Sequence, residues 1–249
     1  MHRFYMPPEH CRTEPFTLTP EEAHHACVVL RLRVGDECTV LNGVGSRWHC
    51  RILSIRQREV IVQPGALEFI PAPPCLVFLV PGIAKPKAMD WILQKSVELG
   101  AAEVHPLCTD HSVSRPDPDE ARDKQLRWQA TAIEAAKQCG TAWLTRVQPP
   151  QTVATFLQGG SVSELRLLGS LRPESRSINS ALDLFQRDHQ RLPKTISILI
   201  GPEGDFSCDE LAQFEAKGAV PVTLGPWVLR CETAALAALA IVQHELRQR

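Results

Sequence analysis

The sequence predicts an α/β protein in which a small β-rich domain precedes a larger domain built on a parallel sheet. Residues 1–70 contain short alternating runs broken by Gly35, Asn42-Gly43 and Gly45, a pattern typical of β-hairpins. After residue 75, apolar runs of strand length alternate with helical patterns, which favours a parallel sheet with helices on both faces. The proline-rich stretch 71–74 indicates a stiff connector, so we expect domains at 1–72 and 73–249.

The first domain offers one short helix among its predicted strands. Thr19 is placed to cap this helix, and Glu22 follows three residues later, as in a capping box. The runs "DECTVLNG" and "WHCRILSI" alternate like half-buried strands. Together they predict a small β-rich fold, with a barrel as one possible form.

The second domain is expected to alternate strands and helices along the chain. The predicted strands are 75–82, 103–107, 165–170, 195–201 and 220–225, and the predicted helices are 87–100, 123–140, 207–217 and 232–246. The first helix should end at Gly100, and Ser207 with Glu210 forms a capping box for the third. The buried side of the first helix, 87–100, should carry Met89, Ile92, Leu93, Ser96 and Val97. The stretches 141–164 and 172–194 give no clear pattern.

Bulk composition excludes several classes of protein. The 249 residues carry a formal net charge of −1, so any affinity for nucleic acid must come from a local patch. The N-terminus "MHRFYMPPEHCR" lacks the apolar core of a signal peptide, and the apolar run 234–242 is too short to cross a bilayer. We therefore expect a cytoplasmic protein without a membrane partner. Nine scattered cysteines, without zinc-type spacing, predict no metal site.

Two glycine turns follow predicted strands, at Gly201-Pro-Glu-Gly204 and at Gly225-Pro226. Ligands of α/β sheets bind beyond the carboxyl ends of strands, although such turns also use glycine and proline for their shape alone. The sequence has no P-loop, no dinucleotide fingerprint and no nucleophile elbow. Because Glu203 would repel a phosphate, the first turn better suits an uncharged, adenosine-like group held by peptide groups.

The second turn runs into a charged junction, "LGPWVLRCETAAL" at 224–236. Arg230 enters an apolar helix start, where an arginine usually has an anionic partner. Glu232, Glu203 and a substrate phosphate are the alternatives. Glu232 and Thr233 also satisfy the capping and helix-dipole preferences of a helix start, so they do not by themselves indicate a site.

A basic patch is expected in the first domain. Residues 31–58 hold six arginines and two acidic residues, a net charge of +4; the arginines are Arg31, Arg33, Arg47, Arg51, Arg56 and Arg58. Trp48 lies among them and offers a stacking surface for a base, unless it is a core residue beneath a solvated face. Arg3 is a further candidate to face RNA.

Five collinear segments together resemble one family. "ILIGPEGDFSCDEL" with "VTLGPWVLRCETAALAAL" is similar to the C-terminal signature of the RsmE family, the 16S ribosomal RNA (uridine-N3) methyltransferases of the SPOUT class. The opening "HRFY" and the segments 24–43, 87–113 and 127–140 resemble the same family. The resemblance implies an N-terminal PUA-like β-barrel, and a C-terminal SPOUT α/β domain with a deep trefoil knot. It also implies a homodimer that uses S-adenosylmethionine to modify the 30S subunit.

The resemblance directs the assignment of site residues. Uridine N3 carries a proton, so transfer to it needs a base or electrostatic help; Arg230, Glu232 and Glu203 are the candidates. The target base must also leave its stack. RNA contacts are expected from Arg3, Arg31, Arg33, Arg47 and Trp48. S-adenosylmethionine is expected to rest mainly on backbone groups, at Leu168, Gly169, Ile200, Gly201, Glu203, Gly204, Leu224, Gly225, Leu229, Thr233 and Ala234.

This chain departs from the family pattern at several positions. Asp205 stands where the family commonly has glycine, and arginines are replaced at Trp227, His111 and Thr141. The lost arginines weaken the expected RNA contacts. Two other functions therefore stay open, namely a knotted methyltransferase acting on another rRNA or tRNA site, and an RNA-binding assembly factor without turnover.

Overall fold

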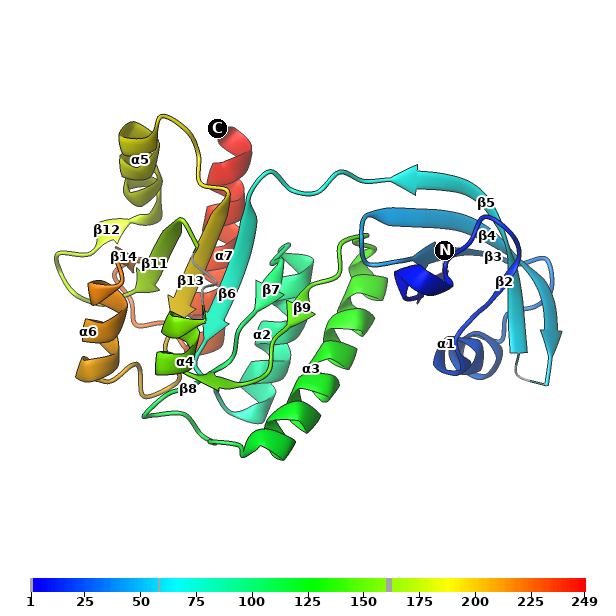
Figure 1. The fold of residues 1–249 in the computed structure, drawn as a ribbon, viewed down its shortest axis with the longest axis horizontal. Helices are drawn as coiled ribbons and strands as arrows, with labels where there is room; N and C mark the ends of the chain where they lie inside the picture. Colours follow the sequence, from blue (N-terminus) through cyan, green and yellow to red (C-terminus); the bar gives the residue numbers. More distant parts are fainter. Residues whose placement is uncertain (1, 58, 160–162) are drawn as a thin grey trace. The chain divides into compact units, whose positions relative to one another are not determined.

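The computed structural model describes residues 2–57, 59–159 and 163–249 (Figure 1). The chain divides into two compact units. The first comprises Met1–Ala72 together with Ile133–Leu144, and the second comprises Pro73–Ala132 together with Thr145–Arg249. No sequence motif signalled that residues 133–144 pack with the N-terminal segment.

The first unit is built on one five-stranded sheet. Its strands lie in the order β1 (His2–Tyr5), β3 (Glu37–Leu41), β4 (Ser46–Arg56), β5 (Glu59–Phe69) and β2 (Phe16–Thr17). β1 pairs with β3 in parallel and the other pairs are antiparallel. The β-rich prediction is confirmed. In hydrogen-bonding terms the described strands form an open sheet, with β1 and β2 at its ends.

A short helical segment packs against this sheet. η1 (Pro8–His10) is a single 3-10 turn, and α1 (Pro20–His24) continues into the π-helix η2 (His25–Val29). Thr19 Oγ1 accepts a hydrogen bond from Glu22 N at 3.3 Å, as predicted. Glu22 does not return the bond, because its carboxylate accepts from Tyr5 N and pairs with Lys137 at 3.0 Å. Only the Thr19 half of the predicted capping box therefore forms.

The second unit contains a seven-stranded sheet whose described pairs are all parallel. The order is β12 (Arg176–Ser177), β14 (Ala219–Thr223), β11 (Leu165–Gly169), β13 (Thr195–Ile200), β6 (Leu76–Pro81), β7 (Glu103–Val104) and β9 (Arg146–Val147). β8 (Leu107–Cys108) and β10 (Gln151–Thr152) form a separate parallel pair. The parallel α/β prediction is confirmed.

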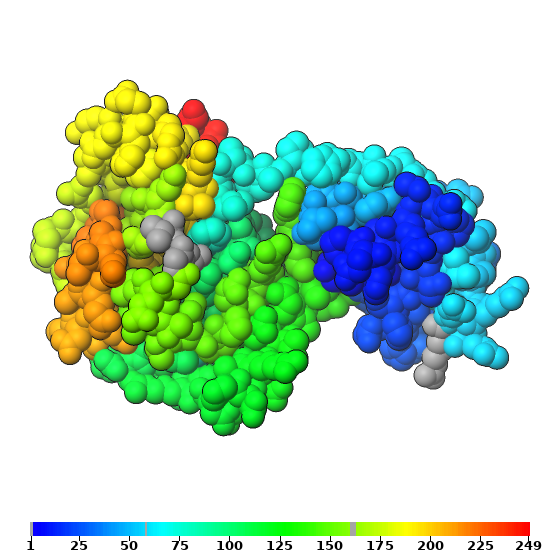
Figure 2. All heavy atoms as spheres, in the orientation of Figure 1, coloured from blue at the N-terminus to red at the C-terminus, as the bar shows by residue number. Residues whose placement is uncertain are grey.

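Helices cover both faces of this sheet (Figure 1). They are α2 (Pro86–Glu98), α3 (Pro118–Cys139), α4 (Val153–Gln158), α5 (Ile178–His189), α6 (Cys208–Ala216) and α7 (Cys231–Gln248). Phe156 of α4 and Phe214 of α6 share a cluster with Val80, Leu168 and Leu199 of the strands. α4 and α6 lie side by side on that face in the space-filling view (Figure 2). α7 packs on β6 and β13 and against α2.

Local signals placed most of these helices correctly. α2 buries the five residues expected of it, and Gly100 follows it at φ +77°. Ser207 and Glu210 form the reciprocal capping box of α6. α3 begins at Pro118, five positions before the predicted start at residue 123. α4 and α5 fall in the two stretches that gave no pattern. Within the described residues, no helix is both long and apolar enough to cross a membrane.

Candidate functional site

Three strand ends meet at the carboxyl edge of the parallel sheet. β11 lies between β13 and β14, so the chain leaves the sheet at neighbouring positions after Ile200, Gly169 and Thr223. The two glycine turns follow the outer two of these strands. Leu168 and Gly169, also predicted site residues, end the middle strand. The strand order thus gathers segments that are up to 55 positions apart, from Gly169 to Leu224.

The first turn is tightly packed at 201–205. Gly82 N donates to Ile200 O at 2.8 Å, and a Cβ on Gly82 would lie 2.8 Å from Pro202 N. A Cβ on Gly201 would lie 2.8 Å from Asp205 Cα. Asp205 has φ +60° and its N–H donates to Pro202 O at 2.9 Å. This left-handed conformation explains why glycine suits position 205, and it makes Gly201 a steric requirement.

The second turn exposes apolar side chains beside a free arginine. Gly225 has φ +125°, and the side chains of Trp227 and Val228 are 78% and 79% exposed. Arg230 is exposed at the N-cap position of α7. Within the described part of the chain its guanidinium forms no ion pair, with Glu203, Glu232 or any other carboxylate. Of the three predicted partners, a substrate group is the one left.

The thiol of Cys231 is affected by a glutamate of each turn region. Burial raises its pKa to about 12, with further contributions from the hydrogen bond to Glu232 and from the charge of Glu203. Sγ donates to Glu232 Oε2 at 3.3 Å. Glu203 Oε1 accepts from Lys85 N, just before α2, at 3.1 Å. Both glutamates therefore lie near the first turn of α7, and both already accept a hydrogen bond.

Peptide groups are available on both turns. Among the residues that the structure describes, the backbone N–H and C=O groups of Gly201, Glu203, Gly204 and 227–229 have no intramolecular partner. Free peptide donors and acceptors beside a glycine turn are what an adenosine-like ligand requires. The remaining predicted cofactor residues lie around them. Leu224 and Leu229 are half-buried beside Gly225, and Thr233 and Ala234 lie in the first turn of α7.

A third loop, 109–113, packs against the first turn and was not identified as part of the site from the sequence. Asp110 N donates to Glu210 Oε1, and Ser207 Oγ donates to Asp110 Oδ2. His111 Nδ1 lies 3.0 Å from Asp205 O. A Cβ on Gly204 would lie 2.9 Å from His111 Cβ, so the two residues are in close contact. The signal in the sequence was the family segment that contains His111.

The predicted RNA-binding residues of the first unit fall into two groups. Arg3 donates to the carbonyl oxygens of Lys137 and Gln138 at the end of α3, so its guanidinium has a structural role. Arg47 donates to Gly140 O and pairs with Glu68 at 3.5 Å. Trp48 is a correction, because its side chain is only 7% exposed and packs in the core, where no base can stack on it.

The second group, Arg31 and Arg33, remains available for RNA binding. Arg31 and Arg33 are exposed, and no described residue pairs with either guanidinium. Arg31 has φ +55°, directly after the π-helix and Leu30. Arg51 pairs with Glu37 at 3.2 Å, which reduces the net charge of the predicted patch. Arg58 lies outside the described residues.

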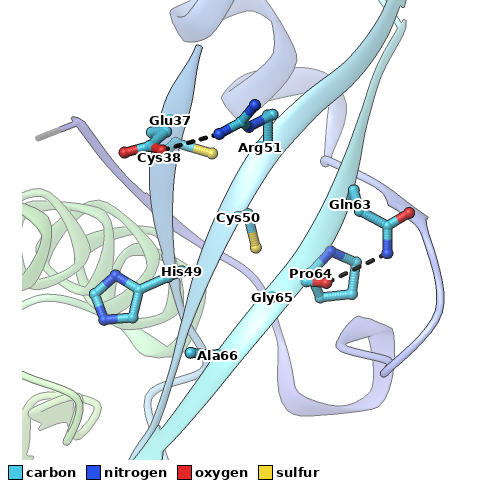
Figure 3. A pocket seen from close by; sticks show the side chains of 9 residues that line it. All are labelled: Glu37, Cys38, His49, Cys50, Arg51, Gln63, Pro64, Gly65 and Ala66. Carbon is cyan, nitrogen blue, oxygen red and sulfur yellow. Dashed lines mark hydrogen bonds and ion pairs between the residues drawn. The ribbon is translucent and has the colours of Figure 1, made fainter. Parts of the chain in front are cut away.

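A depression of about 530 Å³ lies on the sheet of the first unit (Figure 3). It is lined by residues of β3, β4 and β5, and of the predicted basic patch only Arg51 is among them. The pairing of β4 with β5 has a register shift there, between Trp48 and Cys50. Arg51 binds Glu37, and Gln63 Nε2 donates to Pro64 O, so the polar lining is largely self-paired. As for metals, the described residues hold no group of three or more His, Cys, Asp or Glu able to bind an ion.

Comparisons with known proteins identify the family. The RNA methyltransferase domain family matches residues 71–243, and the RNA methyltransferase PUA domain family matches residues 18–64. Over 242 residues the chain is 31% identical to ribosomal RNA small subunit methyltransferase E of Synechocystis sp., covering 96% of this chain and 76% of that protein. The chain belongs to the ribosomal RNA small subunit methyltransferase E family. The family predicted from the sequence is confirmed.

Further relatives and solved structures extend the likeness. The Bacillus subtilis protein is 30% identical, covering 92% of this chain and 90% of its own length. A methyltransferase of Legionella pneumophila, solved with its cofactor SAM bound, superposes with a TM-score of 0.86 at 30% identity, covering 97% and 96% of the chains. Methyltransferase E of Neisseria gonorrhoeae, bound to S-adenosyl methionine, superposes at 0.84 with 27% identity, covering 98% and 97%.

Proposed function

We propose that this chain methylates N3 of a uridine in the 16S rRNA of the small ribosomal subunit, using S-adenosylmethionine. The observation that carries the proposal is the carboxyl edge of the sheet, where two glycine turns leave peptide groups without partners next to a free arginine. Membership of the methyltransferase E family supports both the cofactor and the RNA substrate. S-adenosylmethionine supplies an electrophilic methyl group when bound.

The cofactor is held by three loops in this proposal. Peptide groups of 201–204 and 227–229 would bind its adenosine and amino-acid portions. The carboxyl end of β11 and the first turn of α7 would complete the pocket. The predicted set comprises Leu168, Gly169, Ile200, Gly201, Glu203, Gly204, Leu224, Gly225, Leu229, Thr233 and Ala234. Gly201 has the decisive role, because any side chain there displaces Asp205.

Arg230 is the residue we assign to the substrate. It lies at the start of α7, where the helix dipole also favours negative charge. Its free guanidinium binds a phosphate of the RNA or stabilises the uracil anion as the N3 proton leaves. Glu203 lies on the first turn and Glu232 in the first turn of α7. They shape the pocket through their hydrogen bonds, Glu203 with Lys85 N and Glu232 with Cys231 Sγ.

Arg31 and Arg33 are the RNA-binding residues that the first unit supports best. Both are exposed and unpaired among described residues, and Arg31 adopts a backbone conformation that costs energy in a non-glycine residue. π-helices such as the one before it occur often at functional sites. Arg3 and Arg47 serve mainly to hold residues 137–140, and contribute to RNA binding only through the surface they shape.

Further properties follow from the same proposal. The protein acts as a homodimer in the cytoplasm, without a metal ion, and its domain boundary lies at 72/73. The C-terminal domain is threaded as a deep trefoil knot, and the N-terminal domain is PUA-like. The sequence resemblance supports these properties, and a crystal structure of the dimer with its cofactor would test them together.

The deciding experiment is methylation in vitro with labelled S-adenosylmethionine. Assembled 30S subunits and naked 16S rRNA, both from cells that lack the modification, are compared as substrates. We expect transfer to one uridine in the 30S subunit, mapped as a primer-extension stop and identified as 3-methyluridine by mass spectrometry. Transfer to another RNA would favour a different target, and cofactor binding without any transfer would favour an assembly factor.

A further inference from the structure

The loop 109–113 places one histidine over the first glycine turn. His111 is exposed, and it touches Gly204 through Cβ and the ring. Its Nδ1 lies 3.0 Å from the carbonyl oxygen of Asp205, the residue held at φ +60°. Glu210 and Ser207 hold the preceding residue, Asp110, so α6 anchors the loop. The ring is therefore fixed beside the turn that binds the cofactor in the proposed function.

The contact with Asp205 O fixes the tautomer of the neutral ring. A carbonyl oxygen only accepts hydrogen bonds, so Nδ1 must carry the proton and donate it. The other ring nitrogen, Nε2, then carries a lone pair. No described residue donates to Nε2. This arrangement, in which a carbonyl group orients an imidazole and leaves its second nitrogen free, is that of a positioned general base.

The other candidates for a base are already bonded. Glu203 accepts from Lys85 N and Glu232 accepts from Cys231 Sγ. Nε2 of His111, by contrast, has no described partner. The free lone pair of His111 is thus better suited to take a proton than either glutamate.

We propose that His111 is a catalytic residue, the general base that removes the N3 proton of the target uridine. The inference rests on the proposed function. The N3–H bond breaks and its proton passes to Nε2 of His111. The N3 electron pair forms the bond to the methyl carbon that the cofactor supplies, and the electrons of the broken carbon–sulfur bond stay on sulfur. The imidazolium then returns its proton to water.

Charged groups surround His111 on each element that packs against it. Asp110 and Arg115 lie on its own loop and pair at 2.9 Å. Glu203 and Asp205 lie on the turn, and Glu210 lies in the first turn of α6. Asp110 is engaged by Ser207 and Arg115, and its pKa is lowered mainly by the bond from Ser207. These carboxylates stabilise the imidazolium that forms during the reaction.

The test compares His111→Asn with His111→Arg. Asparagine keeps a donor near the position of Nδ1, so the bond to Asp205 O and the turn survive, but it cannot accept the proton. Arginine restores the residue type of the family pattern and a permanent charge. In single-turnover methylation of 30S subunits we expect both variants to lose 100-fold or more. His10→Asn, at an exposed histidine whose side chain has no described hydrogen bond, serves as the matched control and keeps the wild-type rate.

Three readouts distinguish a base from other roles. Calorimetry should show unchanged binding of S-adenosylmethionine to His111→Asn. The wild-type rate should rise with pH through the range in which imidazoles titrate, and this rise should vanish in the variant. Imidazole ¹⁵N spectra of the protein alone should show Nδ1 protonated and Nε2 free at pH 8.

Several outcomes would overturn the assignment. A wild-type rate in His111→Arg would show that position 111 supplies charge for a phosphate, as would a lower salt dependence of RNA binding in His111→Asn. An Nε2–H tautomer in the spectra excludes the base directly. If the wild-type protein is active and His111→Asn is equally active, the role of His111 is wrong but the proposed function stands. Wild-type protein that transfers nothing to N3 removes the proposed function and this inference together.

Discussion

At the carboxyl edge of the parallel sheet, peptide groups are left free, whereas on the sheet of the first unit most charged side chains bind one another. Among the described residues, the backbone groups of Gly201, Glu203, Gly204 and 227–229 lack intramolecular partners. On the other sheet, Arg47 pairs with Glu68 and Arg51 with Glu37. A site built on backbone can be located from glycine positions, but one built on charge cannot be located by counting arginines.

The largest expected effect lies in the first unit, at its buried ion pair. Lys137 Nζ lies 3.0 Å from Glu22 Oε1, and both side chains are buried. Lys137→Met leaves Glu22 buried without its cation, which should cost about 3–5 kcal/mol of unfolding free energy. Urea unfolding measures this loss. Glu134→Gln is the matched control, since Glu134 also pairs with Lys137 but is exposed, so its loss should matter much less.

The same pair predicts a pH dependence. Burial raises the pKa of Glu22 in the folded protein, against the opposing effect of Lys137. The folded state therefore keeps the Glu22 proton to a higher pH than the unfolded chain, and its contribution to stability is lost as pH rises through the folded pKa. The deficit of Lys137→Met should be largest at neutral pH and shrink in acid. A deficit independent of pH would argue against an electrostatic cause.

Next in size is the effect of Gly201→Val on cofactor binding. The new side chain meets the backbone of Asp205 and must displace the turn. We expect calorimetry to show a loss of about 100-fold or more in affinity for S-adenosylmethionine, roughly 2.7 kcal/mol. Gly218→Ala, at φ +80° before β14 with nothing within 4 Å of the new Cβ, introduces backbone strain at the other end of the sheet. It should lower stability without changing affinity; if both variants bind normally, the site is not at this turn.

A smaller effect is expected from reversing Arg31 and Arg33 together. Arg31→Glu/Arg33→Glu should weaken RNA binding by about tenfold or more and lower the slope of log affinity against log salt by about two. Filter binding across a salt series measures both. Arg122→Glu/Arg127→Glu on α3 changes the net charge equally and is the control. An equal effect of both pairs would mean that RNA responds only to total charge.

The smallest expected effect tests whether the two turns are neighbours. Glu203 contributes to the raised pKa of Cys231, after burial and Glu232. Glu203→Gln should lower that pKa and speed alkylation of Cys231 at alkaline pH by less than tenfold. Mass spectrometry of the labelled peptide gives the rate, and the exposed Cys208 is an internal reference. An unchanged alkylation rate would mean that the turn 201–204 does not lie close to Cys231 at the start of α7.

Local patterns in the sequence predicted elements better than they predicted the use of charge. α2, its buried face and the end at Gly100 follow from periodicity and a cap, and the Ser207–Glu210 box marked α6. α5 was missed although its buried face is Ile178, Ala181, Leu182 and Phe185, because polar residues and a left-handed Gln190 obscure its limits. α4 has only six residues, which is too short for a periodic signal.

The candidate site shows the same limit. The glycine turns were found from spacing, but their adjacency depends on β11 lying between β13 and β14, which is a long-range pairing. His111 became a candidate only when its contact with Asp205 was known. Trp48 looked like a stacking platform because arginines flank it, yet alternation along β4 directs it into the core.

The grouping of residues 133–144 with the N-terminal segment has a consequence for biosynthesis. Glu22 and Arg3 both find their partners at the end of α3, which supplies Lys137 and the carbonyl oxygens that Arg3 binds. When the nascent chain has emerged only to residue 72, the carboxylate of Glu22 has no Lys137 to pair with. The first unit is therefore completed only after residue 144 leaves the ribosome. A fragment that ends at the proline-rich connector lacks residues 133–144 of this unit.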